Sequence, residues 1–346
     1  MEHKQFLKEV TALPGLTGNE IRVAEYIKSK WEPLADDVVI NSTNSVIANK
    51  KGKGPKVMFA AHLDEIGLMV SRIEEDGSLR VAQVGGVDPR ILPAMRVKVF
   101  AKDGVLTGVV GAKAPHLLTE KERSQNYSLN DLYVDVGMPA EKVKEKVRVG
   151  DEVQLEYRFI DLLNNRIAVK TCDDRACVTI LYKAMQLLQD MRHDADLYFV
   201  ATCQEEIGLY GAKTAGFHVN PDFAVALDVC HAHTPDSNPC RTNDIDAVVA
   251  SKGPYINTFL RDKLQETADE QNIRLQVSVV NRGTSTDLDS LSVQHAGIPS
   301  VLIELPLKYM HTSVENIDMR CIDDAARLLA HFAQKVSADW EEELWI

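Results

Sequence analysis

The chain of 346 residues lacks the features that mark several large classes of protein. Its first residues contain no apolar core of a secretory signal, and no apolar run approaches the about 18 residues that a membrane-spanning helix needs. It has no internal repeat and no low-complexity segment. Aromatic residues make up only 6% of the chain, which is few for lining a sugar-binding groove. We therefore expect a cytoplasmic protein without a membrane partner.

Positive charge is also in short supply. The chain has 39 Lys and Arg against 51 Asp and Glu, and its net charge of −12 argues against a nucleic-acid partner. Its six cysteines are irregularly spaced and form neither a C-x-x-C pair nor a zinc-knuckle pattern. Reduced thiols without a disulfide framework are typical of a cytosolic protein.

The length suggests two domains, and the texture of the sequence changes where one would be inserted. Residues 56–61 read K-V-M-F-A-A, the pattern of a strand buried on both faces. Short alternating segments with frequent turns follow, and then apolar strands and amphipathic helices alternate again. We expect an α/β fold with a mixed sheet sandwiched by helices, formed by residues 1–67 and 164–346. Residues 68–163 are expected to form an inserted, mostly-β domain.

Local patterns predict several elements of the α/β part. Residues 197–203, 223–227 and 301–305 read as apolar strands, and residues 174–188 carry apolar side chains at helical spacing. The series Thr17-Gly18-Asn19-Glu20 has the form of a capping box and predicts the start of a helix there.

Six chemically active residues, spread over about 250 positions, form the most informative pattern in the chain. They are His62, Asp173, Glu205, Glu206, Asp228 and His311. Most of them follow an apolar run, which is where an α/β sheet delivers side chains to a crevice. Two imidazoles and three carboxylates can hold two divalent cations with one carboxylate shared, and the remaining carboxylate is a candidate general base.

Two of these sites also have an ordinary structural explanation. His62 directly follows an apolar strand, and by itself it would be interpreted as a hydrogen-bonded core histidine. Asp64, two residues later, favours a metal ligand instead, because a carboxylate is the usual outer partner of a metal-bound imidazole. Asp173 and its neighbour Asp174 can cap a helix, and one of them can do so while the other binds a metal.

The other candidates leave the same choice open. Glu205 and Glu206 are either a solvated loop pair or a ligand beside a free base. Asp228 needs either a cation or a basic side chain once it is buried, and His311 alone decides nothing. What favours a metal site is the joint pattern, because the set has the composition of a dinuclear centre.

Six segments, taken in order, carry a resemblance to a known family. They are A-H-L-D-E-I-G, V-G-G-V-D-P-R, T-C-D-D-R, C-Q-E-E-I-G, A-L-D-V and K-Y-M-H-T-S-V-E. In these segments, and over nearly its whole length, the chain resembles the M42 metallo-aminopeptidases, the tetrahedral aminopeptidases of which some members are labelled endoglucanases. Residues 283–289 are more polar than the usual family pattern, which leaves the preferred N-terminal residue open.

The resemblance implies a zinc-peptidase-like catalytic domain that holds two divalent metal ions, usually zinc or cobalt. Asp173 would bridge the two ions. His62 and Asp228 would complete the shell of one ion, and Glu206 and His311 would complete that of the other.

The same resemblance assigns the remaining roles. Glu205 would be the general base, and Asp64 would orient His62. The inserted β domain would support assembly into a homo-oligomer, a dodecamer enclosing a chamber, in which short peptides with a free N-terminus lose their first residues.

The sequence therefore predicts an enzyme, a metal-dependent aminopeptidase in which a metal-activated water attacks the peptide bond. Another dinuclear metallohydrolase, such as a deacylase or a carboxypeptidase, would use the same ligands on other substrates. A glycoside hydrolase needs two carboxyls on opposite sides of a sugar, which the adjacent Glu205 and Glu206 do not suit. A non-catalytic binding protein would have no need of a free base beside the ligands.

Overall fold

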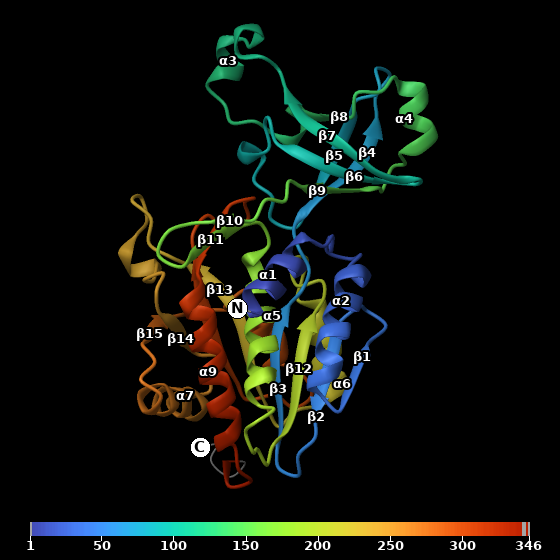
Figure 1. Cartoon of the computed structure of the whole chain (residues 1–346). Coiled ribbons are helices and arrows are strands. Elements are labelled where there is room, and N and C mark those ends of the chain that lie inside the picture. The colour runs from blue at the N-terminus through green and yellow to red at the C-terminus, as the bar shows by residue number, and fades with distance from the viewer. Residues whose placement is uncertain (1, 341–343, 345–346) are drawn as a thin grey trace.

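The computed structural model describes residues 2–340 and Leu344, and its larger lobe is built on one eight-stranded sheet (Figure 1). In spatial order the strands are β1 (Asp37–Ile40), β2 (Val46–Lys50), β12 (Asp196–Thr202), β3 (Lys56–His62), β13 (Phe223–His231), β16 (Ser300–Leu307), β14 (Val248–Lys252) and β15 (Leu275–Val279). The four strands from β12 to β16 run parallel, whereas β1, β2 and the β14–β16 pair are antiparallel. The sheet is therefore mixed, as the sequence predicts.

Both faces of this sheet are buried, which explains why its central strands are apolar without alternation. In β3, Val57 and Phe59 belong to the core on one face and Met58 and Ala60 to the core on the other. The first face is covered by α1 (Glu2–Ala12), α2 (Ile21–Trp31), α5 (Cys172–Leu187), α7 (Thr258–Glu270) and α9 (Met319–Lys335). The second face is covered by α6 (Tyr210–Val219) and α8 (Asp287–Leu291).

The smaller lobe is a closed barrel with its own apolar core (Figure 1). Around the barrel the strands are β4 (Gly67–Ile73), β5 (Leu79–Val84), β8 (Leu132–Asp135), β7 (Gly104–Ala112), β6 (Arg96–Ala101) and β9 (Glu152–Leu155). The short helices α3 (Glu120–Arg123) and α4 (Ala140–Lys146) accompany it, with the 3-10 turns η2 (Pro89–Ile91), η3 (Pro115–Leu117) and η4 (Leu129–Asp131). The predicted β-rich insertion is thus an antiparallel barrel, while its exact boundaries at 68 and 163 stay a prediction.

A small sheet joins the end of the insertion to the C-terminal part of the chain. It consists of β10 (Ile160–Asp161), β11 (Arg166–Val169) and β17 (Glu315–Asp318), with β11 in the centre. The remaining turns are η1 (Glu32–Leu34) and η5 (Pro239–Arg241). Because β11 leads directly into α5 and β17 into α9, this sheet fixes the start of both helices.

The predicted capping box is wrong in detail. Helix α2 begins at Ile21, and the residue before it, Glu20, makes no side-chain cap. The Thr17 hydroxyl instead donates to the buried carboxylate of Asp64, so a partner distant in sequence takes the group that the local pattern assigned to the helix. A helix in that place is nevertheless present.

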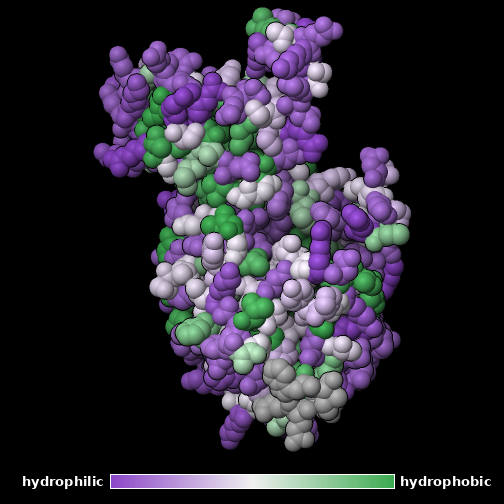
Figure 2. All heavy atoms as spheres, turned by 180° about the vertical axis from the view of Figure 1, so that it is seen from behind, coloured by the Kyte–Doolittle hydropathy of each residue, from purple (hydrophilic) through white to green (hydrophobic). Residues whose placement is uncertain are grey.

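The surface of the barrel carries exposed hydrophobic side chains. Seen from behind, hydrophobic residues gather on part of the upper lobe, whereas they are scattered over the larger one (Figure 2). The exposed hydrophobic residues of the barrel include Val105, Val109 and Val149. Among the described residues, no helix combines the length and the apolar character needed to cross a membrane.

Candidate metal centre and active site

The six candidate residues, which are far apart in the sequence, meet at one edge of the eight-stranded sheet. His62 is the last residue of β3, Asp173 lies in the first turn of α5, and the adjacent Glu205 and Glu206 lie in the loop after β12. Their side chains, together with those of Asp228 from β13 and His311 from the loop after β16, line one cavity of about 400 Å³.

Asp173 lies between the two imidazoles. Its Oδ1 is 3.0 Å from Nε2 of His62, and its Oδ2 is 3.1 Å from Nε2 of His311. Oε1 of Glu206 is 3.5 Å from the same His311 nitrogen. A carboxylate whose two oxygens face two different imidazoles has the geometry of a group shared between two sites.

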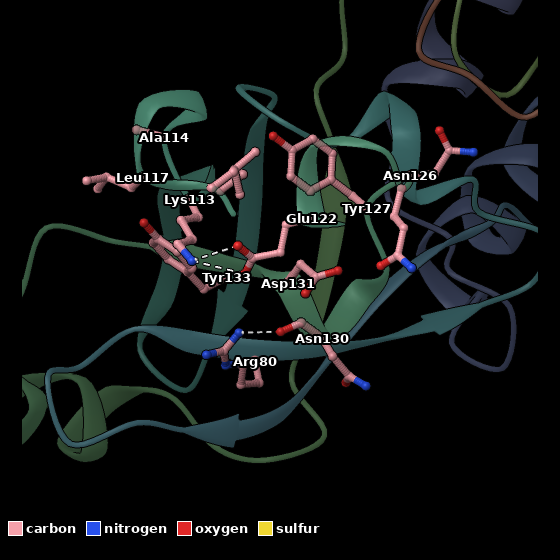
Figure 3. Close-up of a pocket in the computed structure, with 13 residues that line it drawn as sticks. Arg80, Lys113, Ala114, Leu117, Glu122, Asn126, Tyr127, Asn130, Asp131 and Tyr133 are labelled. Atoms are coloured by element: carbon pink, nitrogen blue, oxygen red, sulfur yellow. Dashed lines mark hydrogen bonds and ion pairs between the residues drawn. The ribbon is translucent and has the colours of Figure 1, made fainter. Parts of the chain in front are cut away.

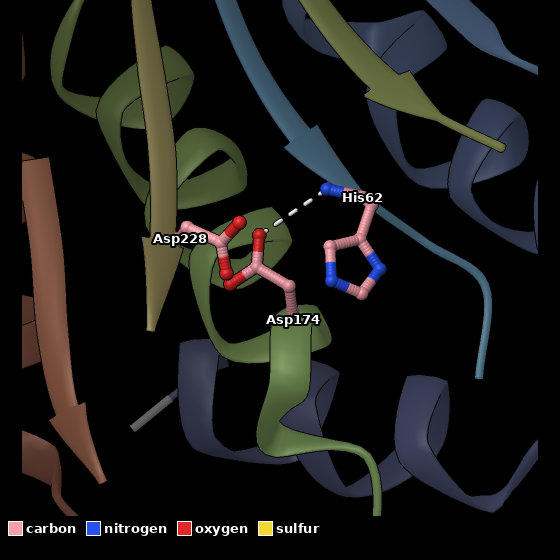
Figure 4. Close-up of side chains that lie close together, drawn as sticks. All are labelled: His62, Asp174 and Asp228. Carbon is pink, nitrogen blue, oxygen red and sulfur yellow. Dashed lines mark hydrogen bonds between the residues drawn. The ribbon is translucent and has the colours of Figure 1, made fainter. Parts of the chain in front are cut away.

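Two sets of three side chains place their donor atoms within 4.8 Å of one another, as a metal ion requires. One set is His62, Asp173 and Glu206, and the other is His62, Asp174 and Asp228. Figure 4 shows the second set converging, with the backbone N–H of His62 donating to Oδ2 of Asp174 over 3.2 Å. From the sequence, Asp174 could either cap a helix or bind a metal. In the structure its side chain lies beside His62 and Asp228.

Asp228 reaches the site from inside a strand and not from its end. Strand β13 continues for three residues beyond it, because Val229, Cys230 and His231 still pair with β16. The Asp228 side chain is nevertheless only 6% exposed, and its Oδ1 accepts the N–H of Val229 over 2.7 Å. The apolar run in the sequence ends earlier than the strand, so hydrophobicity alone could not locate the strand end.

The pKa shifts in the cluster indicate that its buried carboxylates need compensating positive charge. Burial raises the pKa of Glu205 to about 10 and that of Asp228 well above its ordinary value, and neighbouring carboxylates add to both shifts. Burial would lower the pKa of His311, but Asp173 and Glu206 raise it to about 11. Burial likewise opposes ionisation of Asp173, but His311 and His62 hold the pKa of that carboxyl far below its usual range. The cluster therefore favours bound positive charge.

The donor set fits divalent cations. Imidazole nitrogens and carboxylate oxygens are the ligands of zinc and of related transition metals. Oδ1 of Asp174 and Nδ1 of His62 are buried without a hydrogen-bond partner within the described part of the chain. Buried polar atoms of this kind call for an explanation, and a cation near Asp174 supplies one. For His62, Nδ1 lies 3.4 Å from Oδ1 of Asp64, which marks Asp64 as the partner that would orient the ring.

Glu205 lies beside the cluster, but its carboxylate is farther from His62 than that of Asp173. Its Oε2 is 3.8 Å from Nε2 of His62, and the side chain is 10% exposed. The backbone N–H groups of Glu205 and Glu206 donate to the two oxygens of Asp64, over 3.1 and 3.3 Å. Asp64 thereby ties the loop that carries both glutamates to the strand end that carries His62.

Glu315 is a supporting residue that the sequence analysis did not single out. Its Oε2 accepts the N–H of Asp173 over 3.0 Å, and its Oε1 accepts the N–H of His311 over 2.8 Å. His311 has a φ of 60°, a region that residues other than glycine seldom adopt, so this contact helps to hold an unfavourable backbone. In the sequence, Glu315 is the last residue of the segment K-Y-M-H-T-S-V-E, four residues after His311, but nothing in that position by itself assigns it a role.

A second supporting group lies beneath the site. Glu65 accepts from Lys170 and from the hydroxyl of Thr171, and Arg175 lies 3.7 Å from its other oxygen. All four residues are buried. Arg175 also donates to the carbonyl of Leu63, so this charged group fixes the chain immediately after His62.

A larger cavity, of about 600 Å³, lies on the barrel and contains none of the candidate residues. Figure 3 shows Lys113 paired with Glu122 at 3.0 Å and Arg80 donating to the carbonyl of Asn130 over 2.9 Å. Arg80 also pairs with Glu74, and no cluster of metal-binding side chains lies in this cavity among the described residues. Size alone therefore does not identify the reactive site.

A mixed α/β sheet that carries a buried histidine and carboxylate cluster at one edge is typical of metal-dependent hydrolases. Comparison with known proteins narrows this class. The model of the family described as M42 glutamyl aminopeptidase matches residues 44–328, and the chain belongs to this M42 family. It is 36% identical to a lysyl aminopeptidase of Pyrococcus furiosus, over 94% of each chain.

Solved structures agree with this assignment. A TET aminopeptidase from the archaeon Thaumarchaeota archaeon SCGC AB-539-E09 superposes with a TM-score of 0.94 at 29% identity, covering 99% of both chains. The TET1 peptidase of Pyrococcus horikoshii, described as assembling into a tetrahedron or a large octahedral shell, gives a TM-score of 0.86 at 28% identity. The comparison covers 96% of the present chain and 100% of the TET1 chain. The expected family, the α/β fold and an enzyme of the peptidase class are confirmed.

Proposed function

We propose that the protein is a metal-dependent aminopeptidase that removes N-terminal residues from short peptides, with two divalent cations and Glu205 as the general base. The observation that carries this proposal is the position of Asp173 between His62 and His311, with Glu205 held beside them. Membership of the M42 family supports the peptide as substrate.

The family resemblance assigns the residues that would hold the cations, and the distances from Asp173 to His62 and His311 support that assignment. Asp173 would be shared, with His62 and Asp228 on one side and Glu206 and His311 on the other. Zinc and cobalt both suit this mixture of imidazole and carboxylate. When bound, the two cations would lower the pKa of a water molecule and polarise the scissile carbonyl.

The side chains of the protein would perform the remaining steps. Glu205 would accept the proton of the attacking water and pass it to the leaving amine, a role that needs a carboxylate close to the metal centre but not bound to it. Asp64 would keep the His62 ring oriented. Glu315 would hold the backbone at Asp173 and His311, so that both side chains keep their positions.

The first experiment is hydrolysis of a panel of aminoacyl-p-nitroanilides by the purified protein, with chelator treatment and add-back of zinc or cobalt. Free substrates should be cleaved and N-acetylated controls should not, and chelation should abolish a rate that added metal restores. Equal cleavage of acetylated substrates would favour a deacylase instead. Activity on a β-glucan that survives chelation would favour a glycoside hydrolase.

We also propose that the inserted barrel, residues 68–163, supports assembly of a homo-oligomer. The exposed Val105, Val109 and Val149 are apolar groups that a neighbouring copy could cover, and the Pyrococcus horikoshii relative forms large shells. A dodecamer is the expected form. Native mass spectrometry of the protein, which has a chain mass of 38.5 kDa, tests this, and a monomer at micromolar concentration would contradict it. A cytoplasmic location stays a prediction.

A further inference from the structure

The candidate cavity contains one carboxylate that the proposed mechanism does not use. Glu304 lies in β16 and is paired in register with Asp228 of the parallel strand β13. Paired residues of neighbouring parallel strands place their side chains on the same face of the sheet, with the strands about 4.8 Å apart. Glu304 therefore lies one strand away from a proposed metal ligand, and it lines the same cavity.

The Glu304 side chain is buried and held in place. It is 8% exposed, and its Oε2 accepts a hydrogen bond from the hydroxyl of Ser251, which is fully buried in β14. Ser278 of β15 pairs in register with Ser251 and also lines the cavity. Three neighbouring strands thus give this end of the cavity a polar surface around a fixed carboxylate.

The charge of Glu304 is not balanced by the protein around it. Its carboxylate forms no ion pair with another described residue, and Ser251 alone offsets the cost of burial, which raises the pKa of Glu304 to about 7. The other carboxylates of the cavity lie around the metal centre, where bound cations would compensate them. A buried carboxylate without a partner is costly, so the site is suited to a cation that arrives from outside.

The proposed function defines what that cation would be. A peptide whose scissile carbonyl lies at the metal centre would place its N-terminal side chain within the same cavity, which Glu304 also lines. We propose that Glu304 is a specificity-determining residue of this aminopeptidase, which binds the terminal ammonium or guanidinium of an N-terminal lysine or arginine. This inference rests on the proposed function.

One feature of the cavity favours the opposite charge. Arg241, on the 3-10 turn η5, also lines the cavity and would attract an acidic side chain. It is an exposed residue, however, whereas Glu304 is buried and fixed by Ser251. Because a buried charge interacts more strongly than one that water screens, we expect Glu304 to determine the preference.

The test compares two N-terminal residues of nearly equal length, lysine and norleucine, which differ in the terminal ammonium. Values of kcat and KM are measured for both p-nitroanilides with the wild-type protein, Glu304→Gln and Arg241→Gln. Glu266→Gln, an exposed residue on α7, is the matched control. Inhibition by free lysine and free norleucine gives a binding readout that does not depend on turnover.

Wild type should prefer lysine. Glu304→Gln should lower kcat/KM for lysine about 30- to 100-fold, mainly through KM, and leave norleucine within about threefold, as expected for loss of a buried charged contact. Inhibition by free lysine should weaken in parallel, while Glu266→Gln changes neither substrate.

Three results would overturn the inference and leave the proposed function intact. One is an unchanged ratio of lysine to norleucine in Glu304→Gln, and another is an equal loss on both, which would assign Glu304 to the substrate's α-amine or to stability. The third is a wild-type preference for glutamate that Arg241→Gln removes. Failure of wild type to cleave any free aminoacyl substrate, with both metals bound, would instead refute the proposed function.

Discussion

The two lobes of this protein treat charge in opposite ways. In the barrel strands and their connections, residues 67–155, the only buried polar side chain among the described residues is Gln154, and the interior is otherwise apolar. The edge of the large sheet buries a histidine, several carboxylates, a lysine and an arginine within a short distance of one another. The barrel has the composition expected of a stable scaffold, whereas the sheet edge bears the energetic cost of burying charge.

The difference indicates where function resides. Burying a charge is unfavourable unless it is paired, so a cluster of buried charges must be compensated by partners within the protein or by bound ions and substrate. At the sheet edge, some buried carboxylates have charged partners within the protein and others do not. Glu65 is paired internally with Lys170 and Arg175, whereas Asp228 and Glu304 form no ion pair with another described residue.

The largest expected effect comes from changing the proposed general base at the sheet edge. Glu205→Gln should lower kcat by about a thousandfold or more, because the amide cannot accept the proton of the attacking water. Both metals should remain bound, as measured by inductively coupled plasma mass spectrometry, since Glu205 is not a proposed ligand. Glu206→Gln is the contrasting variant and should lose metal. Near-wild-type turnover in Glu205→Gln would remove the proposed base.

The next prediction compares an ion pair from each lobe. Lys170→Met should destabilise the protein by about 3 kcal/mol, because it leaves the buried Glu65 without its lysine partner. Lys113→Met breaks an exposed pair with Glu122 on the barrel and should cost less than about 1 kcal/mol. Urea unfolding of both variants gives the difference. Equal costs would show that burial does not separate the lobes.

A cavity in the barrel should affect stability without affecting chemistry. Leu79 is fully buried in the barrel core, and Leu79→Ala should cost about 2 to 4 kcal/mol. The kcat/KM per folded chain should stay within about twofold, because the site residues come from the other lobe. Leu117→Ala, at a position that is 62% exposed, is the control and should be nearly neutral. A large loss of activity in folded Leu79→Ala would connect the barrel core to the site.

The last expected effect concerns the pH dependence of stability and Glu304. Its folded pKa of about 7 lies above the ordinary value of 4.5, so between these values the folded state keeps a proton that the unfolded chain releases. The free energy of unfolding should therefore fall as pH rises from about 4.5 to 7, and the loss should be complete above pH 7. Glu304→Gln should be more stable than wild type at pH 8, by up to about 3 kcal/mol.

This prediction is checked by thermal and urea unfolding of the metal-loaded proteins at pH 5, 6, 7 and 8. The two stability curves should approach each other at low pH, where Glu304 is protonated in both states. Parallel curves would mean that Glu304 is not held in an unfavourable environment. A stabilised variant that no longer selects lysine would show that specificity is obtained at a cost in stability.

Much of the fold could be predicted from local sequence. The apolar run at 56–61 is a strand buried on both faces, and the apolar runs that begin at residues 197, 223 and 301 lie in the strands β12, β13 and β16. Helix α2 was predicted in the right place for an incorrect reason. Its supposed capping residue, Thr17, bonds to Asp64, a contact between residues 47 positions apart that no local pattern reveals.

Local sequence patterns show which chemically active residues are available and that most of the six candidates follow apolar runs, because hydrophobic periodicity is a local property. It also carried the ordered motifs by which the M42 family is recognised. Three relations emerge only in the folded chain: Asp173 faces two imidazoles, Glu315 holds the backbone of Asp173 and of His311, and Glu304 lies beside Asp228. Those relations depend on strand order and register, which are set by packing between segments that are distant in the chain.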